Sequence, residues 1–291
     1  MKKILLVYNP VSGHAAFKKR LDSVIENFQR HGIFLSVYRT CAGNNSDFID
    51  CVKLSGAQGV IAAGGDGTLH DVINWLKKNS LNLPVGIIGS GTSNDFATYL
   101  NMNDEKILDA VAKYRTRPVD LGLANGNEYF INVASAGAFT SIAHEVDSRL
   151  KNFFGKGAYY LRGIGELTNF KTVRFDITAD GNNFSVDAFL FLVINSPSVA
   201  GFKKISDSAQ IDDGKLDFLA LKINSPRSMI TLAKKILAGE SIQDDENIFF
   251  LQATSFEIKS SVELTGDLDG EAGDVLPLKI ETLRHAIRFF C

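Results

Sequence analysis

Three glycine-rich segments in the first third of the chain combine exposed backbone with carboxylate, hydroxyl and amide side chains. They are NPVSG at 9–13, GGDGT at 64–68 and GSGTSND at 89–95. Glycine lets the backbone approach a ligand closely, and the free N–H groups at the start of a helix favour an anion such as phosphate. Together the segments predict a phosphate-binding edge, whereas any one of them alone fits a tight turn between a strand and a helix equally well.

Two aspartates, Asp66 and Asp95, lie within these segments, although a plain phosphate cradle does not need them. A carboxylate beside a phosphate is repelled unless a cation lies between the two. Mg²⁺ suits that position because it binds few protein carboxylates, keeps several waters and bridges phosphate oxygens. The aspartates therefore predict a Mg²⁺–nucleotide site held through water. The alternative is that each caps the N-terminus of a helix.

Several well-known active-site motifs are absent from the sequence. There is no GxxxxGK[ST], and GxGxxG fails because Asn94 takes the place of the last glycine in GSGTSN. P-loop and NAD-binding Rossmann sites are therefore disfavoured. The histidines show no HExxH spacing and no GxSxG occurs, so zinc and serine hydrolases have no support either.

Another group of carboxylates lies in DLDGE at 267–271. An alcohol that attacks a γ-phosphate benefits from a positioned carboxylate that accepts its proton. If the segment were extended, Asp267, Asp269 and Glu271 would share one side of a strand. Asp-Gly is also typical of tight turns, so the residues alone leave both interpretations open.

The elements that would position these residues follow from the hydrophobic pattern. Over 1–122, short aliphatic runs alternate with helix-spaced apolar residues, which predicts a doubly wound parallel α/β sheet. Each glycine-rich segment follows an aliphatic run, so all three are expected at the carboxyl edge, where open α/β sheets bind ligands. Over 123–280, strands separated by turn signals predict a mainly antiparallel β-rich domain, interrupted by helices near 138–151, 157–169 and 226–238.

Composition narrows the class of protein. The 291 residues carry 31 basic and 33 acidic side chains, so no global field attracts nucleic acid. The apolar run at 188–194 is far shorter than the roughly 20 residues of a membrane span. Three cysteines without a CxxC pair argue against a disulfide framework or a zinc site and favour the reducing cytoplasm.

The motifs NPVSG, GGDGT and GTSNDFA, in this order and spacing, resemble the catalytic domain of the diacylglycerol kinase superfamily, which includes sphingosine and ceramide kinases and bacterial soluble lipid kinases. The resemblance spans essentially the whole chain. It implies a nucleotide domain like those of NAD kinase and diacylglycerol kinases, a C-terminal β-sandwich domain, and a final segment, 281–291, that returns to the first domain. ATP would lie in the cleft between the domains.

The resemblance also implies roles for individual residues. Asp66 and Asp95 match an Asp–water–Mg²⁺ network, and in GDLDGE Asp269 would be the general base with Glu271 as a supporting carboxylate. The implied nucleotide-binding residues are Asn9, Ser12, Gly13, Gly64, Gly65, Gly67, Thr68, Gly91, Thr92 and Asn94.

A second, structural Mg²⁺ is implied by QIDDGKLD at 210–217, which fits a family segment associated with such an ion. Asp212 and Asp213 are the candidate ligands. A β-turn before the strand at 215–222 is an equally good interpretation of the same residues.

The sequence departs from the family at two expected phosphate contacts. His14 and Thr98 stand where many bacterial members have a basic residue. Lys18, Lys19 or Arg20 are candidates to supply the charge, although basic residues on a helix face are more often solvated. Weak ATP affinity or another phosphate donor is therefore an alternative.

Two segments of the sequence are candidates for contact with a membrane. The segment 149–163 mixes aromatic and basic residues, which fits either a membrane-docking edge or aromatic packing between two helices. Phe202, Lys203 and Lys204 form a second candidate for such an edge.

Together these features predict a cytoplasmic lipid kinase, peripheral to the inner membrane face, that moves the γ-phosphate of Mg-ATP to the hydroxyl of a neutral lipid. Diacylglycerol is the default substrate, and a sphingoid base, phosphatidylglycerol or a polyprenol is an alternative substrate. The sequence also leaves the oligomeric state open, and a homodimer is one possibility. The alternatives are a NAD kinase-like enzyme, which shares GGDGT, and a nucleotide-binding regulatory protein without turnover. No nucleic-acid partner is expected.

Overall fold

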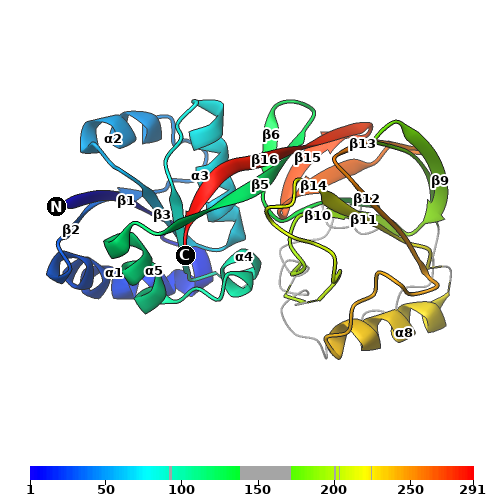
Figure 1. Cartoon of the computed structure of the whole chain (residues 1–291), viewed down its shortest axis with the longest axis horizontal. Coiled ribbons are helices and arrows are strands. Elements are labelled where there is room, and N and C mark those ends of the chain that lie inside the picture. The colour runs from blue at the N-terminus through cyan, green and yellow to red at the C-terminus, as the bar shows by residue number, and fades with distance from the viewer. Residues whose placement is uncertain (92–93, 138–171, 200, 203, 224) are drawn as a thin grey trace. The chain divides into compact units, whose positions relative to one another are not determined.

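The computed structural model describes residues 1–91, 94–137, 172–199, 201–202, 204–223 and 225–291 (Figure 1). These residues form two compact units. The first comprises Met1–Val119 and His285–Cys291, and the second comprises Asp120–Arg284. The C-terminal residues therefore belong to the same unit as the N-terminus.

The first unit is built on a parallel sheet with the strand order β2-β1-β3-β4. The strands are β1 (Lys2–Tyr8), β2 (Ile33–Arg39), β3 (Val60–Gly64) and β4 (Val85–Gly89). The helices are α1 (Ser12–Arg30), α2 (Phe48–Ser55), α3 (Asp66–Lys78), α4 (Asp95–Tyr99) and α5 (Asp104–Lys113). This alternation confirms the predicted doubly wound α/β domain.

Burial explains why the first unit takes this form. Every residue of β3 is buried, as expected for a central strand covered on both faces. Helix α3 buries Leu69, Val72, Ile73 and Leu76, which recur at helical spacing along one face. The buried strand and the apolar face of α3 therefore form the core next to the loops at the carboxyl edge of the sheet.

The second unit is antiparallel. One of its sheets has the order β12-β11-β10-β7-β14-β15, and β16, β13, β8 and β9 pair in another. The strands of the first sheet are β7 (Val133–Gly137), β10 (Leu190–Ile194), β11 (Leu216–Leu221), β12 (Ile248–Ala253), β14 (Thr265–Leu268) and β15 (Glu271–Val275). The other strands of this unit are β6 (Glu128–Phe130), β8 (Val173–Ala179), β9 (Asn182–Ala188) and β13 (Ser255–Ser260). Two further strands, β5 (Thr116–Ala124) and β16 (Leu278–Phe290), each have residues in both units.

Aromatic side chains from both sheets meet in one core. Phe175 of β8 lies 5.2 Å from Phe191 of β10, and Phe218 of β11 lies 5.9 Å from Phe256 of β13, measured between ring centroids. All four rings are buried. The two sheets therefore pack face to face, and the predicted antiparallel sandwich is confirmed.

The second unit also contains α8 (Pro226–Leu237), close to the predicted helix at 226–238. Ser225 caps it by accepting a hydrogen bond from the Ser228 N–H at 3.3 Å. Met229 and Leu232 are buried in a cluster with residues of β10 and β11. The predicted helices near 138–151 and 157–169 lie outside the described residues. None of the helices in the described part of the chain is long and apolar enough to span a membrane.

Candidate functional site

The three glycine-rich segments of the first unit lie at one edge of the parallel sheet. Gly64 and Gly89 are register partners at the ends of β3 and β4, and the Ser90 N–H donates to the Gly64 carbonyl at 2.9 Å. The Asn9 N–H, after β1, donates to the Ala63 carbonyl at 3.2 Å. The structure thus brings together the loops that the sequence analysis placed at this edge.

Asp66 joins two of these loops. Its Oδ2 accepts a hydrogen bond from the Asp95 N–H at 3.1 Å, and its Oδ1 accepts one from the Phe96 N–H at 3.5 Å. Asp66 therefore caps α4, a helix next to the one in which it lies. The side chain of Asp95 is itself buried. Two carboxylates thus lie beside a helix N-terminus and the glycine loops.

Close backbone approach explains the glycine in the first segment. Gly13 has a φ of +54°, and a Cβ at this position would lie 1.6 Å from the Ser90 carbonyl oxygen. Any side chain would collide with the backbone of the third segment. Asn9 shapes the same loop, because its Oδ1 accepts from the Val11 N–H at 3.0 Å and its carbonyl from the Ser12 N–H at 3.4 Å.

Close approach and hydrogen bonds from a side chain to the backbone also shape the second and third segments. A Cβ on Gly64 would lie 2.2 Å from Oγ1 of Thr68, whose side chain is buried. Gly65 precedes α3 in an extended conformation, and Gly67 lies in its first turn. Asn94 closes its own loop by accepting from the Gly91 N–H at 3.0 Å and donating to the Gly91 carbonyl at 2.8 Å. Thr92, also predicted to bind nucleotide, lies outside the described residues.

The basic residues that could replace the missing family contacts are only partly available. Arg20 forms an ion pair with Asp104, so its charge is already matched. Lys18 and Lys19 are exposed on α1, and Thr98 is exposed on α4. Of the three candidates, the two lysines therefore stay as predicted sources of positive charge.

The acidic segment of the second unit forms a hairpin turn. Leu268 of β14 pairs with Glu271 of β15, so Asp269 and Gly270 are the two turn residues, with φ values of 54° and 92°. Asp267 Oδ1 accepts from the Gly270 N–H at 2.9 Å. Consecutive positive φ values are typical of a type I′ turn, which Asp-Gly favours. The turn interpretation is therefore correct and the extended one is wrong.

The turn holds the Asp269 carboxylate in a cradle of backbone amides. Its Oδ1 accepts hydrogen bonds from the N–H groups of Asn132 and Val133, and its Oδ2 accepts one from Ile131, each at 2.9 Å. The Asp269 N–H in turn donates to the Val133 carbonyl at 2.8 Å. Hydrogen bonds to a charged acceptor are strong, so the carboxylate is fixed in one orientation. Glu271 is exposed.

Residues 211–214 also form a turn, just before β11. Asp120 holds it: its N–H donates to the Ile211 carbonyl and its Oδ2 accepts from the Gly214 N–H, both at 2.6 Å. Burial raises the pKa of Asp213, and the nearby carboxylates of Asp120 and Asp217 raise it further.

Neither Asp120 nor Asp217 was singled out from the sequence, although both are carboxylates inside apolar strand patterns, which is the signal that could have found them. No group of three or more His, Cys, Asp or Glu side chains in the described part of the chain is placed to hold a metal. The assignment of Asp212 and Asp213 as metal ligands stays a prediction.

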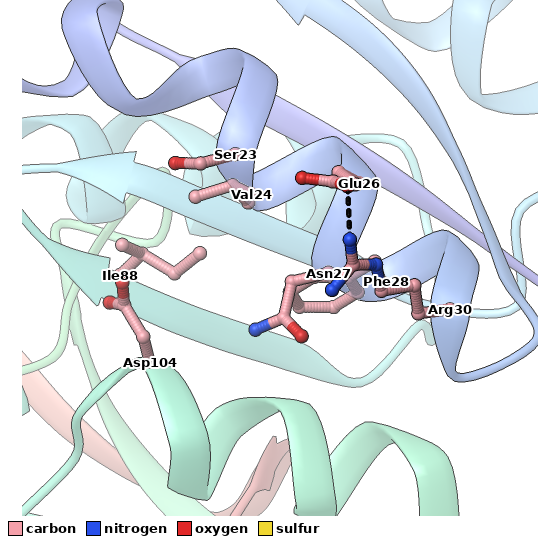
Figure 2. Close-up of a pocket in the computed structure, with 8 residues that line it drawn as sticks. All are labelled: Ser23, Val24, Glu26, Asn27, Phe28, Arg30, Ile88 and Asp104. Atoms are coloured by element: carbon pink, nitrogen blue, oxygen red, sulfur yellow. Dashed lines mark hydrogen bonds and ion pairs between the residues drawn. The ribbon is translucent and has the colours of Figure 1, made fainter.

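A cavity of about 290 Å³ in the first unit lies apart from these residues (Figure 2). Its walls come mainly from the C-terminal half of α1, with Ile88 and Asp104 opposite. The charged groups in its wall are matched, because Arg30 pairs with Glu26 and Asp104 pairs with Arg20. None of the predicted site residues lines it.

Comparisons with known proteins place this geometry in a family. Residues 3–124 match the model of the diacylglycerol kinase catalytic domain, and residues 132–291 match that of the YegS C-terminal NAD kinase beta sandwich-like domain. A diacylglycerol kinase of Bacillus subtilis is 37% identical over 98% of this chain and 95% of its own length. A diacylglycerol kinase of Staphylococcus haemolyticus is 34% identical over 97% of this chain and 86% of its own length.

Solved structures agree with the sequence comparisons. The crystal structure of a diacylglycerol kinase from Bacillus anthracis superimposes with a TM-score of 0.80 at 27% identity, covering 99% of this chain and 96% of that one. Both units of the chain are thus accounted for by one family of enzymes that use ATP. The chain therefore belongs to the diacylglycerol kinase catalytic-domain family, and it is a kinase.

Proposed function

We propose that this chain transfers the γ-phosphate of Mg-ATP to the hydroxyl group of a neutral lipid, and that the lipid is diacylglycerol. The observation that carries the proposal is the contact of the Asp66 carboxylate with the Asp95 amide, among three glycine loops at one sheet edge. The relatives named diacylglycerol kinase, which match along nearly the whole chain, support the choice of substrate.

The donor set of the first unit fits Mg²⁺. Asp66 and Asp95 offer hard carboxylate oxygens, and two carboxylates suit an ion that keeps several of its waters. When bound, Mg²⁺ neutralises charge on the phosphate oxygens during transfer. The chain itself orients the phosphates through the backbone N–H groups of the glycine loops. Asn9, Ser12 and Thr68 contribute to the same phosphate site, together with Gly91, Thr92 and Asn94.

Asp269 accepts the proton of the attacking hydroxyl. The lipid O–H bond breaks as the oxygen forms its bond to the γ-phosphorus, the proton passes to the carboxylate, and ADP leaves with the electrons of the broken P–O bond. The backbone cradle keeps the carboxylate in place for this step. Glu271 supports it as a second negative charge in the same hairpin.

A lipid substrate requires contact with a membrane surface, and we place the protein at the inner face of the cytoplasmic membrane. There are two candidate docking segments. The first, 149–163, lies outside the described residues, and so does Lys203 of the second. Phe202 packs against a buried cluster of the second unit, which favours a core role, whereas Lys204 is exposed. Lys204 is therefore the better candidate for electrostatic contact with anionic lipid.

The test is transfer of radiolabel from the γ-position of ATP, with Mg²⁺, into diacylglycerol, sphingosine, phosphatidylglycerol or a polyprenol in mixed micelles, with NAD as a parallel acceptor. We expect label in the diacylglycerol product. Label in NAD alone would establish the NAD kinase-like alternative. ATP binding with no labelled product in any reaction would establish a regulatory protein, and either result overturns the proposal.

A further inference from the structure

Asn195 is a buried polar residue that the proposed mechanism does not use. It follows the last residue of β10, and its exposed fraction is 0%. Its Nδ2 donates two hydrogen bonds, to the carbonyl of Asp120 at 2.9 Å and to the carbonyl of Ile131 at 2.8 Å. Because both partners are acceptors, they determine which end of the amide is nitrogen.

The other end of the same side chain is unsatisfied. Among the residues that the structure describes, the buried Oδ1 of Asn195 has no hydrogen-bond donor. A buried acceptor without a donor costs stability, so Oδ1 makes no favourable contribution to the fold. The two hydrogen bonds that Nδ2 donates are what the side chain contributes.

Those hydrogen bonds reach the cradle that holds Asp269. The carbonyl of Ile131 and the N–H of Asn132 belong to one peptide group. Asn195 Nδ2 donates to that carbonyl, and that N–H donates to Asp269 Oδ1 at 2.9 Å. A carbonyl that accepts a hydrogen bond makes the N–H of its own peptide group a stronger donor.

The next peptide group repeats the arrangement. The backbone N–H of Asn195 donates to the Asn132 carbonyl at 2.9 Å, and the N–H of the same peptide group, that of Val133, donates to Asp269 Oδ1 at 2.9 Å. Asn195 therefore donates to the carbonyl of each of the two peptide groups whose N–H groups bind Asp269 Oδ1. The register agrees, because Ile194 and Val133 are partners in the β10–β7 pair.

We propose that Asn195 is a positioning residue that acts through the backbone at 131–133 to fix the Asp269 carboxylate for catalysis. The inference rests on the proposed role of Asp269 as the base. Asn195 itself touches neither substrate nor nucleotide in this account. Its side chain fixes the Ile131–Asn132 peptide group, and its second donated bond ties that group to the backbone of Asp120.

The first test probes the backbone amides that bind Asp269, and its result does not depend on enzyme activity. Amide hydrogen exchange of the intact protein should show faster exchange at Asn132 in Asn195→Ala, by about tenfold or more, because the side-chain hydrogen bond to the Ile131 carbonyl is lost. Exchange at Val133 should change less, because the backbone N–H of residue 195 still donates to the Asn132 carbonyl. The matched control is Ser206→Ala. Ser206 is equally buried in the same unit and bonds to Asp217 and Gln243 instead. Unchanged exchange at Asn132 would overturn the inference.

The second test is a double-mutant cycle on kcat. We expect Asn195→Ala to lower kcat about tenfold or more with the KM for ATP within about twofold of wild type, because the base is misplaced while the nucleotide site is intact. In an Asp269→Asn background the same substitution should cause no further loss, because there is no longer a base to position. An equal loss in both backgrounds would show a structural role only.

The outcomes separate this inference from the proposed function. If Asp269→Asn keeps wild-type kcat, the base assignment fails and the inference fails with it. If Asp269→Asn is impaired while Asn195→Ala is not, only the inference fails. Should Asn195→Ala not fold, Asn195→Ser keeps one hydroxyl donor, and an intermediate loss of kcat with intermediate exchange rates is then expected. Wild-type values in that variant would contradict the inference.

Discussion

At the scale of single residues, Asp66 combines an observed structural contact with a proposed role in metal binding. It accepts hydrogen bonds from two amides at the start of α4, which answers the helix-capping alternative, and it is also placed beside Asp95. Capping and metal binding are therefore not exclusive at this position. An amide side chain would keep one acceptor oxygen for the cap but would lose the negative charge.

Asp66→Asn tests which role limits activity. We expect kcat to fall about 10²-fold or more, because the charge that would hold the metal waters is lost, while the protein stays folded. Initial rates of lipid phosphorylation across a Mg²⁺ titration measure the effect. Asp104→Asn is the control, since Asp104 also lies at a helix N-terminus of this unit but pairs with Arg20 and lies outside the proposed site. Full activity with unchanged Mg²⁺ dependence in Asp66→Asn would refute the metal role.

Gly13→Ala tests the close approach of the first and third segments. The new Cβ would meet the Ser90 carbonyl oxygen, so the loops must separate, and we expect the KM for ATP to rise together with a stability loss of roughly 2 kcal/mol or more. Gly43→Ala is the control, because Gly43 has a φ of +84° but nothing within 4 Å of its Cβ. Urea unfolding and ATP kinetics measure both variants. Equal losses in the two would mean that only backbone strain matters.

The residue types at the site could be read from the sequence, but their contacts could not. The glycines and Asp66 stand in short local motifs with a physical reason for each residue type. The collision that makes Gly13 necessary involves Ser90, far away in the chain, and the support of Asp269 by Asn195 passes through a third segment. Such contacts depend on tertiary structure and leave no local pattern.

At the scale of elements, α8 is anchored by a charged pair. Lys235 donates to Asp245 Oδ2 at 2.5 Å, and the side chain of Asp245 is only 4% exposed. Burial by itself would raise the pKa of Asp245, but the hydrogen bonds from Lys235 and Asn247 outweigh it and hold this pKa below its usual value. A carboxyl pKa that is lowered in the folded state contributes stability above the unfolded pKa, and that stability is lost as pH falls through the folded pKa.

Asp245→Asn should therefore destabilise the protein in a pH-dependent way. We expect a loss of about 1–3 kcal/mol at neutral pH, because a hydrogen-bonded charged partner is removed, and a shrinking difference from wild type below about pH 4. Denaturant unfolding at several pH values measures it. Glu257→Gln provides the comparison, since its pair with Lys259 lies on the surface and is worth little. A loss independent of pH would contradict the electrostatic explanation.

Element types were largely predictable because burial dictates them. Continuous apolar runs gave the parallel strands and helix-spaced residues gave the helices of the first unit. The 267–271 segment was ambiguous because alternating carboxylates fit a strand while Asp-Gly fits a turn. The positive φ values of Asp269 and Gly270 decide it, and they reflect the two-residue connection between β14 and β15.

At the scale of the whole molecule, the chain begins and ends in the same unit. Phe289 lies beside Val85 of β4, with its ring 5.0 Å from that of Phe96, and the ring of Phe290 lies 5.5 Å from that of Tyr114. Both phenylalanines are fully buried. Their apolar character was visible in the sequence, but the strand beside which they pack was not, because pairing between distant segments is not encoded in local periodicity.

In the proposed function, the first unit binds the nucleotide and Asp269 of the second unit accepts the proton. Asp269→Asn isolates that step better than alanine does, because asparagine tolerates the positive φ of 54° at this position. The variant keeps the shape of the side chain and one acceptor oxygen for the Asn132 and Val133 N–H groups. It loses the acceptor for the Ile131 N–H and the capacity to accept a proton.

The most direct measurement is therefore the initial rate of label transfer from ATP to diacylglycerol by wild type and by Asp269→Asn, at saturating ATP with nucleotide binding measured separately. We expect the variant to bind ATP as the wild type does and to transfer phosphate about 10²-fold more slowly or worse. A variant that binds ATP and phosphorylates diacylglycerol within about twofold of the wild-type rate would contradict the account.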